Sequence, residues 1–297
     1  MNRYVSPLRY PGGKATMATW LGDMFEQQAG FMDIEVWLEP FAGGAGAGLT
    51  LLDRDLISEL WLVDANPGIA AFHRTVVDDG ETLARRVQRT LPTLDLFHRS
   101  QDVLAAAYDG VHIDTDDLGY AAFIVNRCSR SGIVAPRAGV MSDVTARFTA
   151  DALAERIRRI HRRAHRIRVT HGDGIAHLED LDGTCGIEDE VVAFVDPPYI
   201  REGNRLYANG MSVEAHARLA NALNGTPARW MLTYDDEPAV SDELYPERRV
   251  LAYDIRNTTA GHRVAREYAV FSDNLDVRGL PLAPLPRLGA QYVRDAA

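Results

Sequence analysis

The chain has 297 residues, 46% of them hydrophobic and 25% charged, and a net charge of −10 at pH 7. This composition is typical of a globular protein and predicts one α/β domain with an insertion, or two modest domains. No run approaches the roughly 18 apolar residues of a membrane helix, and MNRYVSPLRY lacks the apolar core of a signal peptide. The cysteines, Cys128 and Cys185, have no metal-binding spacing, so we expect a reducing cytoplasm and no metal site.

The segment RYPGGKAT (9–16) contains the only lysine of the chain, Lys14. Arginine is used at every other position of this charge type, a bias that a GC-rich genome explains. A lysine that escapes such a bias, behind a proline and two glycines, is therefore a candidate functional residue.

Short apolar runs alternate with amphipathic segments along much of the chain. The strand-like runs are rich in branched and aromatic residues and end in acidic or turn residues; they are 34–41, 60–66, 167–173, 191–199, 229–236 and 267–273. Helical patterns cover 14–28, 46–54, 66–77 and 212–224. This alternation predicts a parallel sheet with helices on both faces, and ligands bind such sheets beyond the carboxyl ends of the strands.

The alternation stops for about a hundred residues between the second and third strands, and this interval predicts a mainly helical insertion. Residues 126–168 hold eleven arginines against three acidic residues. In 151–167 the apolar residues recur at spacings of three and four, which predicts a helix with one buried face and arginines on the other. Those arginines are either a solvated face or contacts to phosphates. A basic stripe on an acidic body is compatible with a polyanion bound at one place.

The glycine-rich turn FAGGAGAG (41–48) lies between a predicted strand and a predicted helix. Glycines there allow close backbone approach to a ligand, and a helix N-terminus favours negative charge. The spacing fits neither the dinucleotide-binding nor the P-loop pattern. Asp64 ends the next strand, where it can accept from ribose hydroxyls or cap helix 66–77. Asp173 ends a third strand and can accept from an adenine amino group.

The tetrapeptide DPPY (196–199) directly follows the apolar run VVAFV. Its two prolines stop a central strand and fix an extended turn. The turn brings together the Asp196 carboxylate, the Pro197 carbonyl and the Tyr199 ring. Two acceptors beside an aromatic face suit a planar group that carries an NH2, whose nitrogen lone pair stays free to attack.

In this order, PGGK, EPFAGGAG, D-x-N, NR-x-x-x-x-G and DPPY resemble the Dam/DpnM-type family of DNA adenine-N6 methyltransferases. The likeness runs from about residue 6 to 273 and closes with RNTTAGHR and REYAVFSD. It implies a seven-stranded, Rossmann-like sheet of the S-adenosylmethionine-dependent methyltransferases with a helical target-recognition insertion. The implied catalytic domain comprises 1–75 and 165–280, the DNA-binding insertion 76–164, and the C-terminal tail 281–297.

The resemblance also implies roles for individual residues. The expected catalytic residues are Asp196, Pro197, Pro198 and Tyr199. The expected S-adenosylmethionine-binding residues are Tyr10, Lys14, Phe41, Gly43, Asp64, Asp173, Gly174 and Asp196. We expect a cofactor or a DNA phosphate to fill the space around Lys14, where a compact ammonium fits better than a guanidinium. The target adenine would leave the duplex and be methylated by direct displacement, without a metal.

The implied partner is double-stranded DNA, with a cognate restriction endonuclease as a further candidate, in a bacterial cytoplasm or encoded by a phage. The expected DNA-binding residues are Arg9, Asn126, Arg127, Arg130 and Arg137. The helix arginines Arg159, Arg162, Arg163 and Arg166 could only position the DNA backbone. Cys128 and Arg130 stand where relatives that read GATC carry aromatic residues, and Arg137 is displaced, so GATC is not the expected target.

Three alternatives remain at this stage. A cytosine-N4 methyltransferase usually carries serine at the position of Asp196. An RNA adenine methyltransferase would share the catalytic motif. A non-catalytic DNA-binding protein of the same fold is disfavoured by the intact DPPY and FAGGAGAG.

Overall fold

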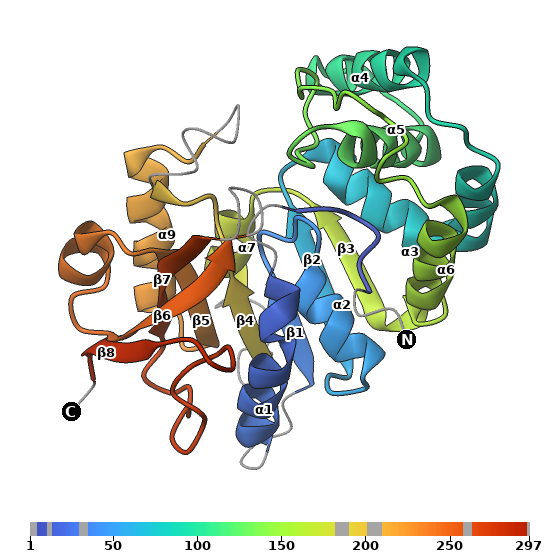
Figure 1. Cartoon of the computed structure of the whole chain (residues 1–297). Helices are drawn as coiled ribbons and strands as arrows, with labels where there is room; N and C mark the ends of the chain where they lie inside the picture. The colour runs from blue at the N-terminus through green and yellow to red at the C-terminus, as the bar shows by residue number, and fades with distance from the viewer. Residues whose placement is uncertain are drawn as a thin grey trace.

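The computed structural model describes residues 5–10, 14–29, 35–181, 190–200, 210–257 and 263–295. Its centre is a mixed sheet with strand order β3-β2-β1-β4-β5-β7-β6-β8 (Figure 1). The strands are β1 (Val36–Glu39), β2 (Glu59–Asp64), β3 (Ile167–His171), β4 (Val191–Val195), β5 (Arg229–Asp235), β6 (Arg249–Asn257), β7 (Arg263–Phe271) and β8 (Ala290–Arg294).

The six predicted strands are all present, but the expectation of a seven-stranded parallel sheet is wrong in two respects. β7 pairs antiparallel with β5 and β6, and β8 pairs antiparallel with β6, so only β3, β2, β1, β4 and β5 run parallel. The eighth strand lies in the segment 281–297 that was expected to be a tail. β8 lies at the edge of the sheet, where most of its side chains are exposed. Its backbone pairing with β6 does not depend on the side chains, so its sequence carries no buried apolar pattern.

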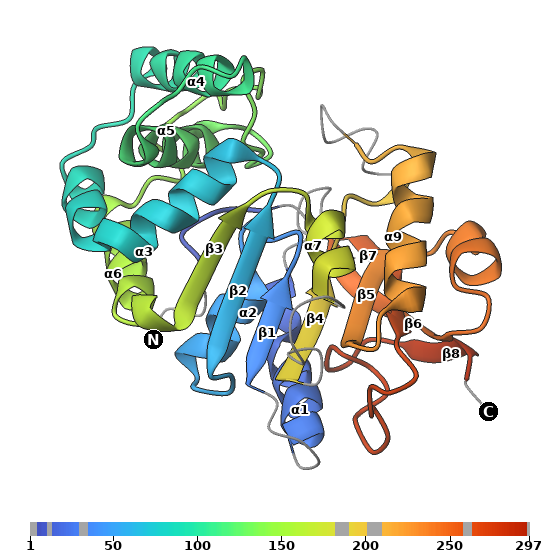
Figure 2. The same ribbon diagram turned by 180° about the vertical axis from the view of Figure 1, so that it is seen from behind.

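Helices cover both faces of the sheet. α1 and α2 lie on one face and α7 and α9 on the other, as the two opposite views show (Figures 1 and 2). Alternation along β1 explains this: Trp37 packs into the first apolar cluster, whereas Val36 and Leu38 pack into the second. These helices are α1 (Ala18–Ala29) after the short 3-10 turn η1 (Lys14–Met17), α2 (Gly46–Asp53), α7 (Gly174–Asp180) and α9 (Val213–Gly225), with the π-helical turn η5 (Val240–Leu244) after β5.

The predicted helical insertion lies between β2 and β3, beside the sheet edge formed by β3 (Figure 1). Asn66 caps its first helix by accepting from the amides of Gly68 and Ile69, at 3.0 and 3.2 Å. This helix extends well beyond the expected residue 77 and departs from helical geometry at Asp79. The insertion contains α3 (Pro67–Gln88), α4 (Leu94–Tyr108), α5 (Thr115–Cys128), α6 (Ala150–His161) and the turn η2 (Ala164–Arg166). Across the described residues, every helix is too short or too polar to cross a membrane.

Candidate active site at the carboxyl ends of the strands

The glycine-rich loop after β1 is fixed on both sides by side chains, those of the half-buried Asp64 and the buried His73. The Gly43 amide donates to Asp64 Oδ2 at 2.7 Å, and its carbonyl accepts from His73 Nε2 at 2.8 Å. Burial lowers the pKa of His73 to about 4, so the ring is neutral and Nε2 carries the proton for this bond. Gly43 has φ +47°, and a Cβ there would meet the Tyr10 ring at 2.7 Å. Only glycine satisfies both conditions.

Asp64 holds the start of this loop and is not the cap of α3, since Asn66 has that role. Its two oxygens each accept one backbone amide, from Gly43 at 2.7 Å and from Asn66 at 2.8 Å. Burial raises the pKa of Asp64, and the two amides act in the opposite direction. A carboxylate offers about four acceptor positions, so Asp64 keeps capacity for the two hydroxyls of a ribose. The chemistry of this position therefore fits the expected cofactor.

The loop after β3 packs closely against the loop after β1. A Cβ on Gly174 would lie 1.9 Å from the Pro40 carbonyl oxygen, so this position requires glycine. Asp173 accepts from the Ile175 amide at 2.9 Å and pairs with Arg218 at 2.6 Å. The bond from the Ile175 amide makes Asp173 the N-cap of α7. The expected contact of Asp173 to adenine stays a prediction. The half-buried Phe41 packs on the same side of the sheet, in the second apolar cluster.

The DPPY turn leaves the sheet at the end of β4, next to β1. The Asp196 side chain is 24% exposed and is surrounded by donors. Its Oδ1 accepts from Thr233 Oγ1 of β5 at 2.6 Å and from the Tyr199 hydroxyl at 3.2 Å. Pro197 is buried, whereas Pro198 and Tyr199 are partly exposed. The four predicted catalytic residues thus lie beside the glycine-rich loop at one edge of the sheet.

Lys14 is the main counter-charge of Asp196. Its Nζ donates to Asp196 Oδ1 and Oδ2, at 2.9 and 3.1 Å, and to the Tyr199 hydroxyl at 2.7 Å. The residue is only 3% exposed, and a buried ammonium needs a nearby anion. The side chains of Asp196, Tyr199 and Glu267 surround this ammonium, and the expected contact to a cofactor or DNA phosphate stays a prediction. Gly12 and Gly13 lie outside the described residues.

A second carboxylate faces Lys14 from the antiparallel part of the sheet. Glu267 Oε2 on β7 lies 3.6 Å from Lys14 Nζ and accepts from the Tyr253 hydroxyl of β6 at 2.7 Å. Burial raises the pKa of Glu267, while Lys14 lowers it. Sequence analysis missed Glu267, although it lies in the quoted segment REYAVFSD. An acid inside a strand gives no local sign that the strand is buried on that side.

Glu39, at the end of β1, is another buried acid that sequence analysis missed. It is 4% exposed and accepts from the Gly48 amide at 2.6 Å and from Trp37 Nε1 at 3.1 Å. These bonds supply an acceptor for the first turn of α2, whose own N-cap residue has no side-chain bond. Burial raises the pKa of Glu39 to about 7.

Two of the predicted DNA-binding residues are buried and bind the chain's own backbone. Asn126 accepts from the Arg9 amide at 2.8 Å and donates to the carbonyls of Arg9 at 2.7 Å and Gly132 at 2.5 Å. Arg127 donates to the carbonyls of Pro7, at 3.3 Å, and Arg147. Both side chains therefore attach the N-terminal segment to the insertion.

The remaining predicted DNA-binding residues gather around a loop of the insertion. The Arg9 guanidinium donates to the carbonyls of Ser129 at 2.8 Å and Arg130 at 3.0 Å; burial, with a smaller effect of Arg147, lowers its pKa to about 10. Arg130 and Arg137 are exposed. Beside them is a depression of about 300 Å³, lined by Arg130, Met141, Ser142, Asp143, Ala146 and Arg147.

The arginines on and after α6 were expected to form either a solvated face or contacts to phosphates. Most of them instead pair with carboxylates of the chain. Both Arg159 and Arg163 pair with Asp53, at the end of α2, whose side chain is 9% exposed. Further pairs join Arg158 to Glu81 at 2.8 Å, Arg166 to Asp55 at 2.6 Å and Arg168 to Glu59 at 3.1 Å. Arg162, directly after α6, pairs with Glu155 of that helix. Arg159, Arg163 and Arg166 therefore clamp the insertion to the sheet domain, whereas Arg158 joins α6 to α3 within the insertion.

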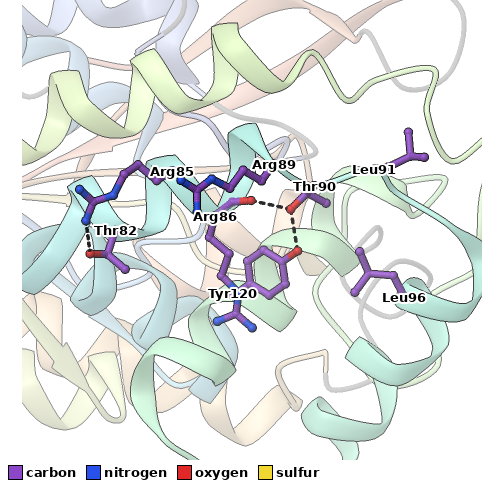
Figure 3. A pocket seen from close by; sticks show the side chains of 8 residues that line it. All are labelled: Thr82, Arg85, Arg86, Arg89, Thr90, Leu91, Leu96 and Tyr120. Carbon is purple, nitrogen blue, oxygen red and sulfur yellow. Dashed lines mark hydrogen bonds between the residues drawn. The ribbon is translucent and has the colours of Figure 1, made fainter.

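A larger depression, of about 760 Å³, lies away from this site, between the end of α3, the start of α4 and α5 (Figure 3). Its wall includes Arg86, which stacks 3.8 Å from the Tyr120 ring centroid and pairs with Asp117 at 2.8 Å. Its lining residues are Thr82, Arg85, Arg86, Arg89, Thr90, Leu91, Leu96 and Tyr120, none of them from the candidate site.

No protein-family model matches the chain, and neither does any curated protein. Among solved structures, protein LPL1258 from Legionella pneumophila str. Philadelphia 1, of the DUF519 family model, is similar with 9% identity and a TM-score of 0.41, over 87% of this chain and 84% of that one. The rRNA methyltransferase aviRa from Streptomyces viridochromogenes is similar with 15% identity and a TM-score of 0.41, over 88% and 85%. Neither likeness is close enough to assign an activity.

Proposed function

We propose that this chain is an S-adenosylmethionine-dependent DNA methyltransferase that modifies the N6 amino group of adenine. One observation carries the proposal: the Asp196 carboxylate and the Tyr199 ring lie at the end of β4, beside a glycine-rich loop that Asp64 holds at the end of β2. Such an arrangement places an acceptor for an amino group next to a site suited to a ribose-containing cofactor.

The cofactor would be held at the ends of β1, β2 and β3. Asp64 has acceptor capacity for ribose hydroxyls, Gly43 allows close approach of the backbone, and Phe41 offers an apolar surface. When bound, S-adenosylmethionine supplies an activated methyl group on a sulfonium sulfur. The residues of the chain supply positioning and hydrogen bonds, which contribute to catalysis by orientation.

At the target base, Asp196 and the Pro197 carbonyl would accept the two amino N–H groups, and the Tyr199 ring would stack on the base. These contacts leave the nitrogen lone pair directed at the methyl group. With the cofactor bound, the nitrogen would take the methyl group while the electron pair of the S–C bond goes to sulfur. The surplus amino proton would pass through the Asp196 carboxylate to solvent.

DNA would be bound by the exposed arginines of the insertion. Arg130, Arg137 and Arg147 are exposed, and within the described ranges their guanidinium groups have neither a carboxylate nor a hydrogen-bond partner. A guanidinium can bind phosphate or read a guanine edge in the major groove. The loop that carries them is tied to the N-terminal segment by Asn126, so DNA contacts there can be coupled to Lys14 and the active site.

The test is transfer of a labelled methyl group from S-adenosylmethionine to unmethylated duplex DNA, followed by nucleoside analysis. We expect N6-methyldeoxyadenosine, and loss of several orders of magnitude in Asp196→Ala with near-normal cofactor binding. Asp95→Ala, which removes an exposed acid paired only with Arg99 on α4, is the matched control and should be unaffected. Methylated cytosine, or no transfer to DNA at all, would each contradict the proposal.

A further inference from the structure

Most acceptor positions of Asp196 are already used in this structure, and Oδ2 keeps one open position beside Lys14. Oδ1 accepts from Lys14 at 2.9 Å, Thr233 at 2.6 Å and the Tyr199 hydroxyl at 3.2 Å, and Oδ2 accepts from Lys14 at 3.1 Å. Lys14 is the only one of these donors that bonds to both oxygens. A substrate amino group that donates to Oδ1 must therefore displace one donor, and one that donates to Oδ2 must share this oxygen with Lys14.

Of the three donors, Lys14 has the clearest alternative partner. Glu267 Oε2 is 3.6 Å from Lys14 Nζ, and a movement of about 0.8 Å would bring this pair to the length of a charge-assisted hydrogen bond. Thr233 is fully buried on β5, and the Tyr199 hydroxyl itself accepts from Lys14 at 2.7 Å. An ammonium has three donors, so Lys14 can change its main partner without losing its charge.

Building on the proposed function, we propose that Lys14 occupies the substrate's amino position on Asp196 in the resting enzyme and moves to Glu267 when the target base enters. Glu267 is then a positioning residue, and it acts through Lys14 without touching the substrate. The hydroxyl of Tyr253, on β6, donates to Glu267 Oε2 at 2.7 Å.

The charges of the cluster make the exchange feasible. Lys14 lies between two carboxylates, so its ammonium stays paired at every point of a short movement and avoids the cost of an isolated buried charge. The substrate's amino group replaces an ammonium on Asp196 with a neutral donor. The Asp196 carboxylate stays hydrogen-bonded throughout, through Thr233 and Tyr199.

Because Lys14 is the only lysine, its side chain can be observed alone. Untagged protein labelled with 13Cε-lysine gives a single lysine signal in NMR spectra. Spectra are recorded for the free protein, with S-adenosylhomocysteine, and with a duplex that carries the site mapped in the transfer reaction. We expect the duplex to shift the signal in the wild-type protein.

In Glu267→Gln we expect the signal to stay at its free-protein position when the duplex is added, because no second carboxylate is available. The kcat/KM for DNA should fall about tenfold, with unchanged cofactor affinity. Tyr253→Phe keeps the carboxylate and removes only the hydroxyl, so it is the matched control. It should retain the shift and most of the kcat/KM.

The two proposals can fail separately. If the wild-type protein transfers no methyl group to DNA, the proposed function fails. If it is active but its lysine signal does not move with the duplex, or Glu267→Gln shows the wild-type shift, the exchange of Lys14 between Asp196 and Glu267 is wrong. A Tyr253→Phe variant as impaired as Glu267→Gln would also overturn it, by making Glu267 structural.

Discussion

The insertion contains two arginine-rich regions, the helix α6 with the turn after it (150–168) and the loop 129–147, and their arginines have opposite surroundings. In 150–168 the guanidinium groups pair with carboxylates of α2, of the loop that follows it, of β2 and of α3. In the loop, Arg130, Arg137 and Arg147 are exposed and have no such partner among the described residues. A local excess of arginine therefore indicates a nucleic-acid surface only where the fold leaves the charges unpaired.

The largest expected effect is the change in stability with pH at the buried Glu39. It should be opposite in direction to that of the carboxylates that pair with the arginines of 150–168. Burial raises the pKa of Glu39 from 4.5 to about 7, so the folded state binds its proton more tightly than the unfolded state. Its contribution is complete below pH 4.5 and is lost as the pH rises through 7, a change of about 3 kcal/mol in the free energy of unfolding. Urea unfolding from pH 4.5 to 8 should show this loss in the wild type and not in Glu39→Gln.

The stability contributed by the carboxylates that pair with the arginines of 150–168 should change with pH in the opposite direction. Hydrogen bonds from Arg166 and Arg158 lower the pKa of Asp55 and Glu81. Their contribution is present above the unfolded values of 3.8 and 4.5 and is lost as the pH falls through the lower folded values. A Glu39→Gln variant that kept the wild-type loss of stability between pH 4.5 and 7 would show that this loss has another source.

Removing one arginine of the clamp should reduce stability and leave DNA binding unchanged. Arg159→Ala leaves the Asp53 carboxylate, which is 9% exposed, with Arg163 as its remaining partner. We expect a loss of about 2 kcal/mol in the free energy of unfolding, measured in urea. The matched control, Arg162→Ala, removes an arginine that is 57% exposed and should cost under about 0.5 kcal/mol. If Arg159→Ala weakens DNA binding at constant stability, the helix contacts phosphates after all.

The loop arginines should show the smallest effect on free energy and no effect on folding. Arg130→Gln and Arg147→Gln should each weaken duplex binding about tenfold at low salt, and each should reduce the slope of log affinity against log salt by about 0.9 if it contacts one phosphate. Fluorescence anisotropy over a salt series measures both quantities. Unchanged slopes together with unchanged affinity would remove the loop from the DNA-binding surface.

The sequence predicted the parallel half of the sheet well, because β1, β4 and β5 are buried on both faces and β2 and β3 are apolar at their buried positions. Runs such as VVAFV and the acids that follow them placed Asp64, Asp173 and Asp196 at one edge, and the structure brings these three strand ends together. β6 and β8 were not predicted. β8 in particular is largely exposed and is specified by pairing with its neighbour, which leaves little trace in its own side chains.

What the sequence determined by itself is therefore local: the strands, the glycine that the Gly43 turn requires, and the polar ends where a ligand can bind. Only the tertiary structure decided which charges meet. Lys14 pairs with Asp196 and Glu267, and Arg159 with Asp53, across distant parts of the chain. Hydrophobic periodicity and turn chemistry act over a few residues and can be recognised in sequence. The partner of a charge depends instead on which segments the packed core places side by side, so one composition of arginines gave both a clamp and an exposed surface.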